Sequence, residues 1–264
     1  MAADEATYWN ERHAADDSLD AVGWAGLGRA FNGWMYAVRR HVFGRAVRAH
    51  VPLDDGVRVL DIGSGTGFYL DVWHDLGAAY VVGSDRSTVA VERLRRARPD
   101  ATILELDLSG APADLPDETY DAVSAMDMLF HITDDEAYTR AIANLTRLVR
   151  PGGVVLLTEN LLGARVSAPQ QVSRTEAEVI RVLREHGLEP VARLPMFVLL
   201  NTPVDSTSRL LARWWGLLIK VASRREWLGW LAGASVFPFE LAAVSLARRG
   251  PSTKLLVCRR IDRR

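Results

Sequence analysis

Short apolar runs rich in β-branched residues alternate with amphipathic stretches along most of the chain from residue 57 onward. Apolar runs bounded by glycine and polar residues predict buried strands, whereas apolar residues spaced three and four apart predict helices. This alternation is typical of a doubly wound α/β fold, in which helices cover both faces of a parallel sheet. The predicted strands cover residues 57–62, 78–84, 101–108, 120–126, 153–159 and 253–261.

Residues at the ends of the amphipathic stretches support the predicted helices. Ser87 is a suitable N-cap for the second of them. Ser173 followed by Glu176 has the spacing of a capping box, and Gly187 is a suitable stop for the same helix. The helices predicted between strands cover residues 66–76, 87–98, 134–150 and 173–187.

Two tryptophan-rich segments lie outside the alternation, one before the first predicted strand and one before the last. The chain therefore divides into an N-terminal helical segment, an α/β core, an apolar helical insertion and a final core strand. These parts cover residues 1–52, 53–200, 201–248 and 249–264.

Composition and charge narrow the range of functions. The 264 residues are 48% hydrophobic, enough for one domain with a sizeable core, and the formal net charge is −1. Because 32 basic residues are balanced by 33 acidic ones, we expect no nucleic-acid partner. Cys258 is the sole cysteine, which excludes an intramolecular disulfide and a cysteine metal cluster, and we expect no metal. The first residues lack the pattern of a secretory signal, so we expect a cytoplasmic protein.

The segment VLDIGSGTG follows the first predicted strand and contains Gly63, Gly65 and Gly67. A dinucleotide-binding loop has the spacing G-x-G-x-x-G, but here Phe68 occupies the position of the third glycine. The carboxylate of Asp61 would also repel a bound pyrophosphate. A carboxylate at this point suits a ligand that carries positive charge. A nicotinamide-dependent oxidoreductase is therefore disfavoured.

Several motifs together resemble those of the class I S-adenosylmethionine-dependent methyltransferases. They are D-I-G-S-G-T-G after an apolar strand, Asp85 in VVGSD, Asp107 in LELDL, and LVRPGG before the fifth strand. The resemblance covers roughly residues 55–195. It implies a Rossmann-like, doubly wound, mostly parallel seven-stranded sheet, and S-adenosylmethionine as the cofactor.

The resemblance also assigns roles to individual residues. The glycine loop and the acid before it would hold the methionine end of the cofactor. Asp85 would accept both ribose hydroxyls, and Arg86 would lie along the adenine ring. Asp107 would accept the adenine amine, with the backbone amide of Leu108 on a ring nitrogen. The backbone carbonyl of Met126 would help to hold the ammonium group.

Methyl transfer from a sulfonium is an in-line displacement, so much of the catalysis is positioning. His131 lies just beyond the fourth predicted strand and is a candidate general base for a hydroxyl acceptor, since its usual pKa is near neutral pH. The alternative is that this histidine only packs at the edge of the cleft. The other histidines are interpreted as ordinary surface or helix residues: His13, His41, His50, His74 and His186.

Aromatic residues before the sheet suggest how the site is covered. Tyr8 and Trp9 resemble the family's N-terminal segment that closes over the cofactor; the alternative is a helix that packs on the core. Residues 27–48 have the periodicity of an amphipathic helix. On that helix Tyr36 and Arg39 are neighbours that could hold an anionic or phenolic acceptor.

The insertion at residues 201–248 has an uncharged run of only about 13 residues, too short to span a bilayer. We expect it to be a helical cap over an apolar substrate pocket; the alternative is a surface that contacts membranes. If it is a cap, its tryptophans should be shielded from solvent. They are Trp214, Trp215, Trp227 and Trp230.

These observations predict a methyltransferase that acts on a small, largely apolar acceptor. Oxygen of a hydroxyl or carboxylate is the preferred acceptor atom, with nitrogen or carbon as alternatives. Two other functions stay open: a protein that binds S-adenosylmethionine without transferring methyl groups, and a methyltransferase for a lipophilic membrane substrate. We expect a monomer or a homodimer, with membrane contact not favoured.

Overall fold

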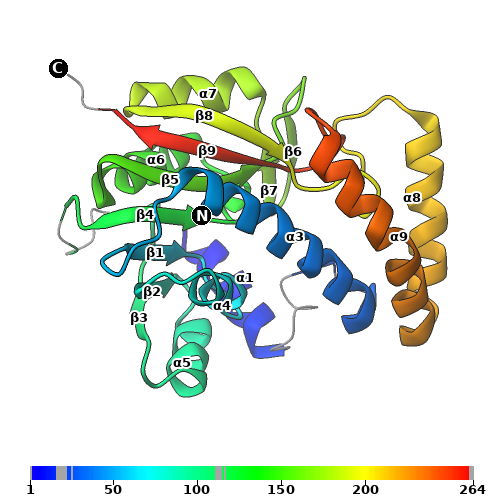
Figure 1. The fold of residues 1–264 in the computed structure, drawn as a ribbon, viewed down its shortest axis with the longest axis horizontal. Coiled ribbons are helices and arrows are strands. Elements are labelled where there is room, and N and C mark those ends of the chain that lie inside the picture. The colour runs from blue at the N-terminus through cyan, green and yellow to red at the C-terminus, as the bar shows by residue number, and fades with distance from the viewer. Residues whose placement is uncertain (1, 16–22, 25, 111–114, 116, 262–264) are drawn as a thin grey trace.

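The central feature of the computed structural model is a seven-stranded, mostly parallel sheet (Figure 1). The structure describes residues 2–15, 23–24, 26–110, 115 and 117–261. The strand order is β3-β2-β1-β4-β5-β9-β8, and β9 is antiparallel to both of its neighbours. The strands are β1 (Arg58–Ile62), β2 (Tyr80–Asp85), β3 (Thr102–Glu105), β4 (Tyr120–Ala125), β5 (Val149–Glu159), β8 (Leu188–Pro195) and β9 (Lys254–Arg260). The predicted fold class is therefore confirmed.

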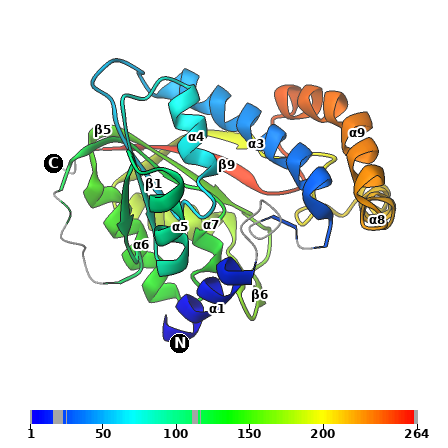
Figure 2. The same cartoon turned by 90° about the horizontal axis from the view of Figure 1, so that it is seen from below.

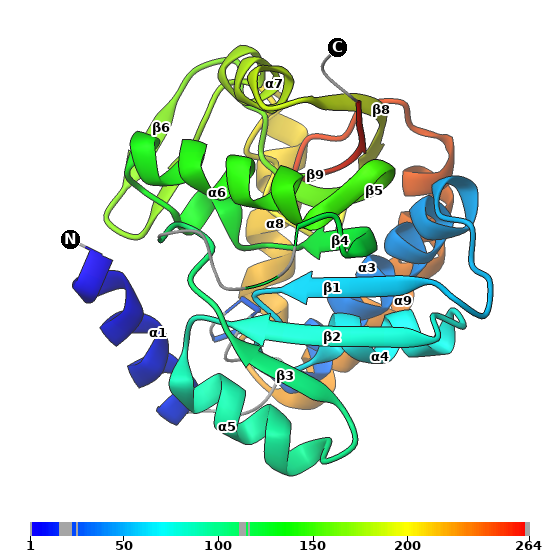
Figure 3. The ribbon, with the colours of Figure 1, turned by 90° about the vertical axis from the view of Figure 1, so that its left-hand side faces the viewer.

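Each face of the sheet has its own apolar core, because successive strand residues point to opposite faces. On β1, Val59 packs toward α3 (Gly28–His50) and α4 (Phe68–Asp75). Leu60 packs toward α6 (Asp135–Leu148) and α7 (Glu176–Glu185). Figure 3 looks onto the sheet between these helix layers. The helices that connect strands are α4 (Phe68–Asp75), α5 (Thr88–Ala97), α6 (Asp135–Leu148) and α7 (Glu176–Glu185).

The capping prediction at Ser87 is correct, since its hydroxyl accepts a hydrogen bond from the backbone N–H of Ala90 at 3.3 Å. The prediction at Ser173 is wrong. The capping box at the start of α7 is formed by Thr175 and Glu178. Ser173 instead ends strand β7 (Gln171–Ser173), which pairs with β6 (Val166–Ala168) in a small separate hairpin.

Helices α1 (Ala2–Ala15) and α3 (Gly28–His50) precede the sheet, and α8 (Arg209–Ala222) and α9 (Glu226–Leu246) lie between β8 and β9. The expected helical character of residues 16–22 lies outside the described residues. Helix α9 runs beside α3 along its length, with α8 next to it at one end of the molecule (Figures 1 and 2).

Small and polar residues fix how α9 meets its neighbours. A Cβ atom on Gly233 would lie 2.2 Å from the ring of Trp34, so only glycine allows α3 to approach this closely. The carboxylate of Glu226 accepts the backbone N–H groups of Arg29 and Ala30 at 3.0 and 2.9 Å. It thereby caps the first turn of α3, whose own N-cap is an apolar residue.

Candidate active site

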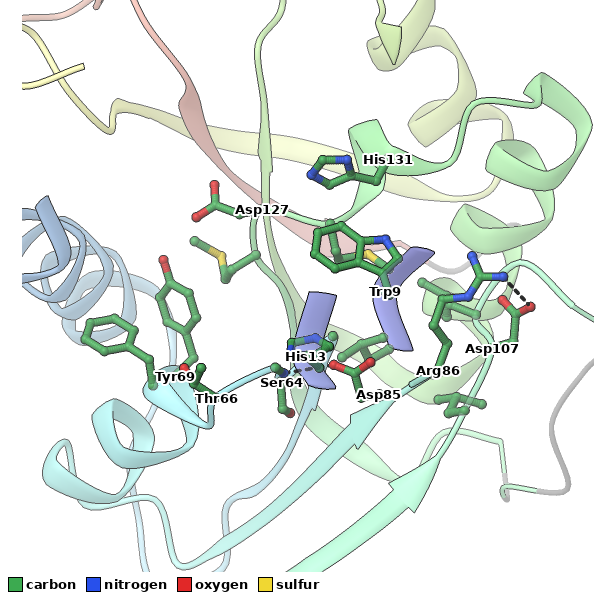
Figure 4. A pocket seen from close by; sticks show the side chains of 18 of the residues that line it. Trp9, His13, Ser64, Thr66, Tyr69, Asp85, Arg86, Asp107, Asp127 and His131 are labelled. Atoms are coloured by element: carbon green, nitrogen blue, oxygen red, sulfur yellow. Dashed lines mark hydrogen bonds and ion pairs between the residues drawn. The ribbon is translucent and has the colours of Figure 1, made fainter. Parts of the chain in front are cut away.

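A cavity opens at the carboxyl ends of the parallel strands, where open α/β sheets bind ligands. Its empty space is about 970 Å³, including the part open to solvent. The walls come from the glycine loop after β1, the ends of β2, β3 and β4, and helices α1, α3 and α4. Figure 4 shows side chains from these elements pointing toward a common space.

The glycine loop has the predicted position and an unusual backbone. Gly63 and Gly65 line the cavity with φ angles of 71° and 53°, in the left-handed region that favours glycine. Gly67 also has a left-handed backbone, but it faces away from the cavity. It is the N-cap of α4, and a Cβ there would lie 2.7 Å from the guanidinium of Arg98. The close contact gives Gly67 a packing role, and its assignment to the cofactor stays a prediction.

Asp61 is buried behind the loop and does not line the cavity, in contrast to the prediction. Its Oδ1 accepts a hydrogen bond from Ser124 Oγ at 2.5 Å, while Oδ2 has no hydrogen-bond partner among the described residues. Burial raises the pKa of Asp61 to about 7. A positively charged ligand in front of the loop would favour the ionised carboxylate. The residues present therefore fit a ligand with a cationic methionine end.

Asp85 lines the cavity at the end of β2 and holds the glycine loop in place. Its Oδ2 accepts the backbone N–H of Gly65 at 2.8 Å, and its Oδ1 accepts that of Ser87 at 2.9 Å. A carboxylate has about four lone-pair sites, so both oxygens can accept further hydrogen bonds from a ligand. This arrangement suits a ribose diol.

The predicted adenine-binding residues also lie together on the cavity wall. Arg86 Nη2 lies 3.6 Å from Asp107 Oδ2, and Leu108 is the next wall residue. Asp107 Oδ1 accepts from both the backbone N–H and the hydroxyl of Ser109, at 2.9 and 2.7 Å. The second oxygen of Asp107 is thus the one directed toward Arg86 (Figure 4).

After β4 the wall continues with Met126, as predicted, and with Asp127, which the sequence did not single out. Asp127 has a left-handed backbone, with φ of 55°. Its Oδ2 accepts a hydrogen bond from Arg39 Nε at 2.7 Å. Arg39 itself does not line the cavity, because its guanidinium lies over the rings of Tyr36 and Phe197, 4.9 Å from each. Arg39, predicted to contact the acceptor, thus reaches the cavity wall only through its hydrogen bond to Asp127.

Two tyrosines border the same end of the cavity. Tyr36 on α3 is buried, and burial raises its pKa to about 12. Tyr69 on α4, also buried, has its pKa raised by burial and by the nearby charge of Asp127. The Tyr69 hydroxyl has no hydrogen-bond partner among the described residues. Both hydroxyls are thus neutral at ordinary pH.

His131 ends a short 3₁₀ helix, η1 (Leu129–His131), on the opposite side of the cavity from α4. Its Nδ1 lies 2.7 Å from the carbonyl oxygen of Gln170. A carbonyl only accepts, so Nδ1 carries the proton and, in the neutral ring, Nε2 keeps the lone pair. This is the tautomer that a general base requires.

Helix α1 covers the cavity with Trp9, one of the two aromatic residues predicted there, and with His13. Trp9 lies edge-on to the His131 ring, with 4.9 Å between ring centroids, and His13 lies one turn further along the same face. Tyr8 points away from the cavity, where its hydroxyl accepts a hydrogen bond from Arg12 at 2.8 Å. Asn10 joins the helix to the core by accepting the Ser87 hydroxyl at 2.7 Å.

His13 is therefore a cavity residue and not the ordinary surface histidine expected. Burial lowers its pKa, although the charge of Asp85 acts in the opposite direction. The spacing of Trp9 and His13, four residues apart on a helix expected to cover the site, was the signal that could have identified it.

The insertion differs from the predicted cap. None of the described residues that line the cavity comes from residues 201–248. Of its four tryptophans only Trp215 is buried, whereas Trp214, Trp227 and Trp230 are 37%, 58% and 52% exposed. Helices α8 and α9 cover the outer side of α3, and the substrate-cap assignment is corrected accordingly (Figure 1).

Known proteins resemble this chain in both sequence and structure. A family model described as a methyltransferase domain matches residues 59–153. A ubiquinone biosynthesis O-methyltransferase of Mesorhizobium japonicum is 31% identical over 139 residues, which are 50% of this chain and 54% of the relative. The corresponding protein of Neisseria meningitidis serogroup C is 34% identical over 107 residues, 39% of this chain and 44% of the relative. The chain thus spans about half the length of these curated relatives.

A phosphatidylethanolamine N-methyltransferase of Cereibacter sphaeroides is 29% identical over 203 residues, 67% of this chain and 92% of the relative. A solved S-adenosylmethionine-dependent methyltransferase from Mesorhizobium loti has a TM-score of 0.51 and 21% identity, covering 82% of this chain and 96% of that one. The [4+2]-cyclase SpnF has a TM-score of 0.54 and 22% identity, covering 84% and 80%. These two structures share the fold. Residues 59–153 thus match a methyltransferase domain, and the fold agrees with that of a class I S-adenosylmethionine-dependent methyltransferase, whose cofactor is S-adenosylmethionine.

Proposed function

We propose that this protein transfers a methyl group from S-adenosylmethionine to an oxygen atom of a small, largely apolar acceptor. The observation that carries the proposal is the division of one cavity into two chemically different ends. One end has the glycine loop and the acids Asp85 and Asp107. The other has neutral tyrosine hydroxyls and a histidine.

The cofactor end follows from the hydrogen-bonding groups on the cavity wall. Asp85 would accept the ribose hydroxyls, and Asp107 with the backbone of Leu108 would bind adenine. The backbone of Gly63 and the carbonyl of Met126 would border the methionine end. When bound, S-adenosylmethionine supplies an electrophilic methyl group on a sulfonium.

The acceptor end would be formed by four residues that line the cavity: Tyr36, Tyr69, Asp127 and His131. The buried tyrosine hydroxyls would orient an oxygen acceptor by hydrogen bonding. Nε2 of His131 would take the proton of a hydroxyl acceptor as its oxygen bonds to the methyl carbon. A carboxylate acceptor arrives ionised and would need only positioning. Relatives with O-methyltransferase in their names support oxygen as the acceptor atom.

The test is formation of S-adenosylhomocysteine from labelled S-adenosylmethionine with a panel of phenols, carboxylic acids and amines. We expect turnover with members of the first two classes, and Asp85→Ala serves as the cofactor-binding control. Turnover confined to amines would contradict the choice of oxygen. Tight cofactor binding with no turnover on any class would instead favour the non-catalytic binding protein. A cytoplasmic location and a monomeric or dimeric state stay predictions.

A further inference from the structure

Large apolar side chains of α8 and α9 are exposed to solvent, and we call the surface that they form the α8–α9 face. Its side chains are between 37% and 83% exposed. Figures 1 and 2 both place the two helices at one end of the molecule. The face consists of Leu210, Trp214 and Leu217 from α8 and Trp227, Trp230, Leu231, Phe239 and Leu246 from α9.

The composition of α9 explains this exposure. The helix is apolar around its whole circumference, yet only one side packs on the protein. The buried side carries Gly229, Gly233, Val236, Glu240 and Val244, at three- and four-residue spacing. The opposite side therefore presents large apolar groups to solvent. Exposed apolar groups gathered in this way mark a contact surface for a partner.

Basic residues outnumber acidic ones in the segment that carries the face. Residues 201–249 contain seven Arg or Lys and three acidic residues. All three acids are already engaged: Asp205 pairs with Lys254, Glu226 caps α3, and Glu240 is buried. No ion pair joins any of the seven to a carboxylate within the described ranges of the chain. The seven are Arg209, Arg213, Lys220, Arg224, Arg225, Arg248 and Arg249.

The ion-paired arginines of the described residues all lie outside this segment. Arg98, Arg147 and Arg150, for example, each form an ion pair with an aspartate. The segment that carries the exposed tryptophans thus has seven positive charges without a carboxylate partner, although the chain as a whole has a net charge of −1. A partner that is apolar inside and negatively charged at its surface complements this arrangement.

We propose that the α8–α9 face docks on membrane surfaces that contain anionic lipid. Tryptophan favours the boundary between lipid chains and headgroups, and arginine attracts the anionic headgroups. Pairing of two copies through the same face fits less well, because a symmetric interface would bring the unpaired positive charges together. This inference goes beyond the proposed function, since the face lies outside the cavity and needs no turnover to bind.

Helix α9 would lie along the membrane surface and not cross it. It is the one helix of the described residues that is long and apolar enough to span a bilayer, and 28% of its most apolar window is buried. The carboxylate of Glu240 on this helix accepts the backbone N–H groups of Val198 and Leu199 at 2.7 and 2.6 Å. Crossing the bilayer would break these bonds and the packing of α9 on α3.

Co-sedimentation with vesicles tests the proposal, using phosphatidylcholine alone and phosphatidylcholine mixed with phosphatidylglycerol. We expect the protein to pellet with the anionic vesicles, with a blue shift of tryptophan fluorescence, and much less with the neutral ones. Reversing two charges by Arg224→Glu with Arg225→Glu should lower the partition coefficient by about tenfold or more. Trp227→Ser with Phe239→Ser should lower it by a similar factor because buried apolar area is lost.

Matched control variants lie away from the face. Tyr80→Ser removes a 61% exposed aromatic at the start of β2, and Arg96→Glu reverses an exposed charge on α5. Both should bind vesicles like the wild type, and circular dichroism should show that all variants are folded. Equal binding by wild type and face variants would overturn the proposal, as would no binding to anionic vesicles. A stable dimer lost on Trp227→Ser with Phe239→Ser would also overturn it. Turnover of a soluble acceptor by the face variants reports on the proposed function separately.

Discussion

Replacing Asp85 by alanine removes the carboxylate that joins the glycine loop to the end of β2. In the structure this carboxylate accepts the N–H groups of Gly65 and Ser87, at 2.8 and 2.9 Å. In the proposed complex it also accepts two ribose hydroxyls. The change therefore acts on the ligand directly and on the loop that surrounds the ligand.

The size of the expected loss in cofactor affinity follows from the hydrogen bonds that the carboxylate makes. A hydrogen bond to a charged group contributes about 1.5 to 3 kcal/mol, and water partly replaces a lost partner. Two such bonds to the ribose give a loss of about 2 to 4 kcal/mol in binding free energy. This corresponds to a dissociation constant about 30 to 1,000 times larger.

Isothermal titration calorimetry with S-adenosylhomocysteine measures this loss. Asp100→Ala is the matched control, because Asp100 is an exposed aspartate after α5 that does not line the cavity. A thermal melt of each variant reports the effect on the loop, separate from that on the ligand. Unchanged affinity in a folded Asp85→Ala protein would refute the assignment of Asp85 to the ribose.

Three further predictions concern the rest of the site. His131→Ala should lower kcat for a hydroxyl acceptor by about 10²- to 10⁴-fold with cofactor affinity unchanged; in steady-state kinetics, a loss below tenfold would assign it to packing. Asp127→Asn leaves Arg39 buried without its counter-charge, while asparagine tolerates the left-handed backbone at this position. Denaturant unfolding should therefore show a free energy of unfolding lower by about 2 kcal/mol, whereas the control Asp100→Asn should show no loss. Burial raises the pKa of Asp61 and Glu159 to about 7, so the stability they contribute is complete below about pH 4 and falls as the pH rises through 7. The melting temperature of the ligand-free protein should therefore fall between pH 5 and 8. The double variant Asp61→Asn with Glu159→Gln should show a weaker dependence of melting temperature on pH, and an unchanged dependence would contradict this prediction.

Most strands of the sheet and the positions of the acids at the ends of β2 and β3 could be predicted because both depend on local sequence. Strands of buried apolar residues, caps such as Ser87, and acids at strand ends are all visible within a few positions. Strand β8 was missed because it contains Pro190 and mostly half-buried residues, as an edge strand can. The capping box was predicted two residues too early, at Ser173 in place of Thr175. The pairing of β7 keeps the chain extended through Ser173, so the helix begins after it.

The acceptor end could not be predicted in the same way because it depends on contacts between distant segments. Arg39 and Asp127 are 88 positions apart, and nothing in either neighbourhood shows that they pair. Burial by the assembled fold also determines the protonation of Tyr36 and Tyr69. Local sequence supplied Tyr36 and Arg39 as neighbours on one helix, but their different roles required the tertiary structure.

The insertion shows how a segment outside the cavity can still determine what the cavity holds. Helix α3 carries Tyr36 and Arg39 on its inner side, and its outer side is fixed by α9 through Trp34 in the groove at Gly233 and the Glu226 cap. A helix held on both sides cannot rotate without breaking these contacts. The position of the Tyr36 hydroxyl therefore depends on α9, although no residue of α9 lines the described cavity. If the α8–α9 face docks on a membrane, the same helix connects the bound surface to the acceptor end.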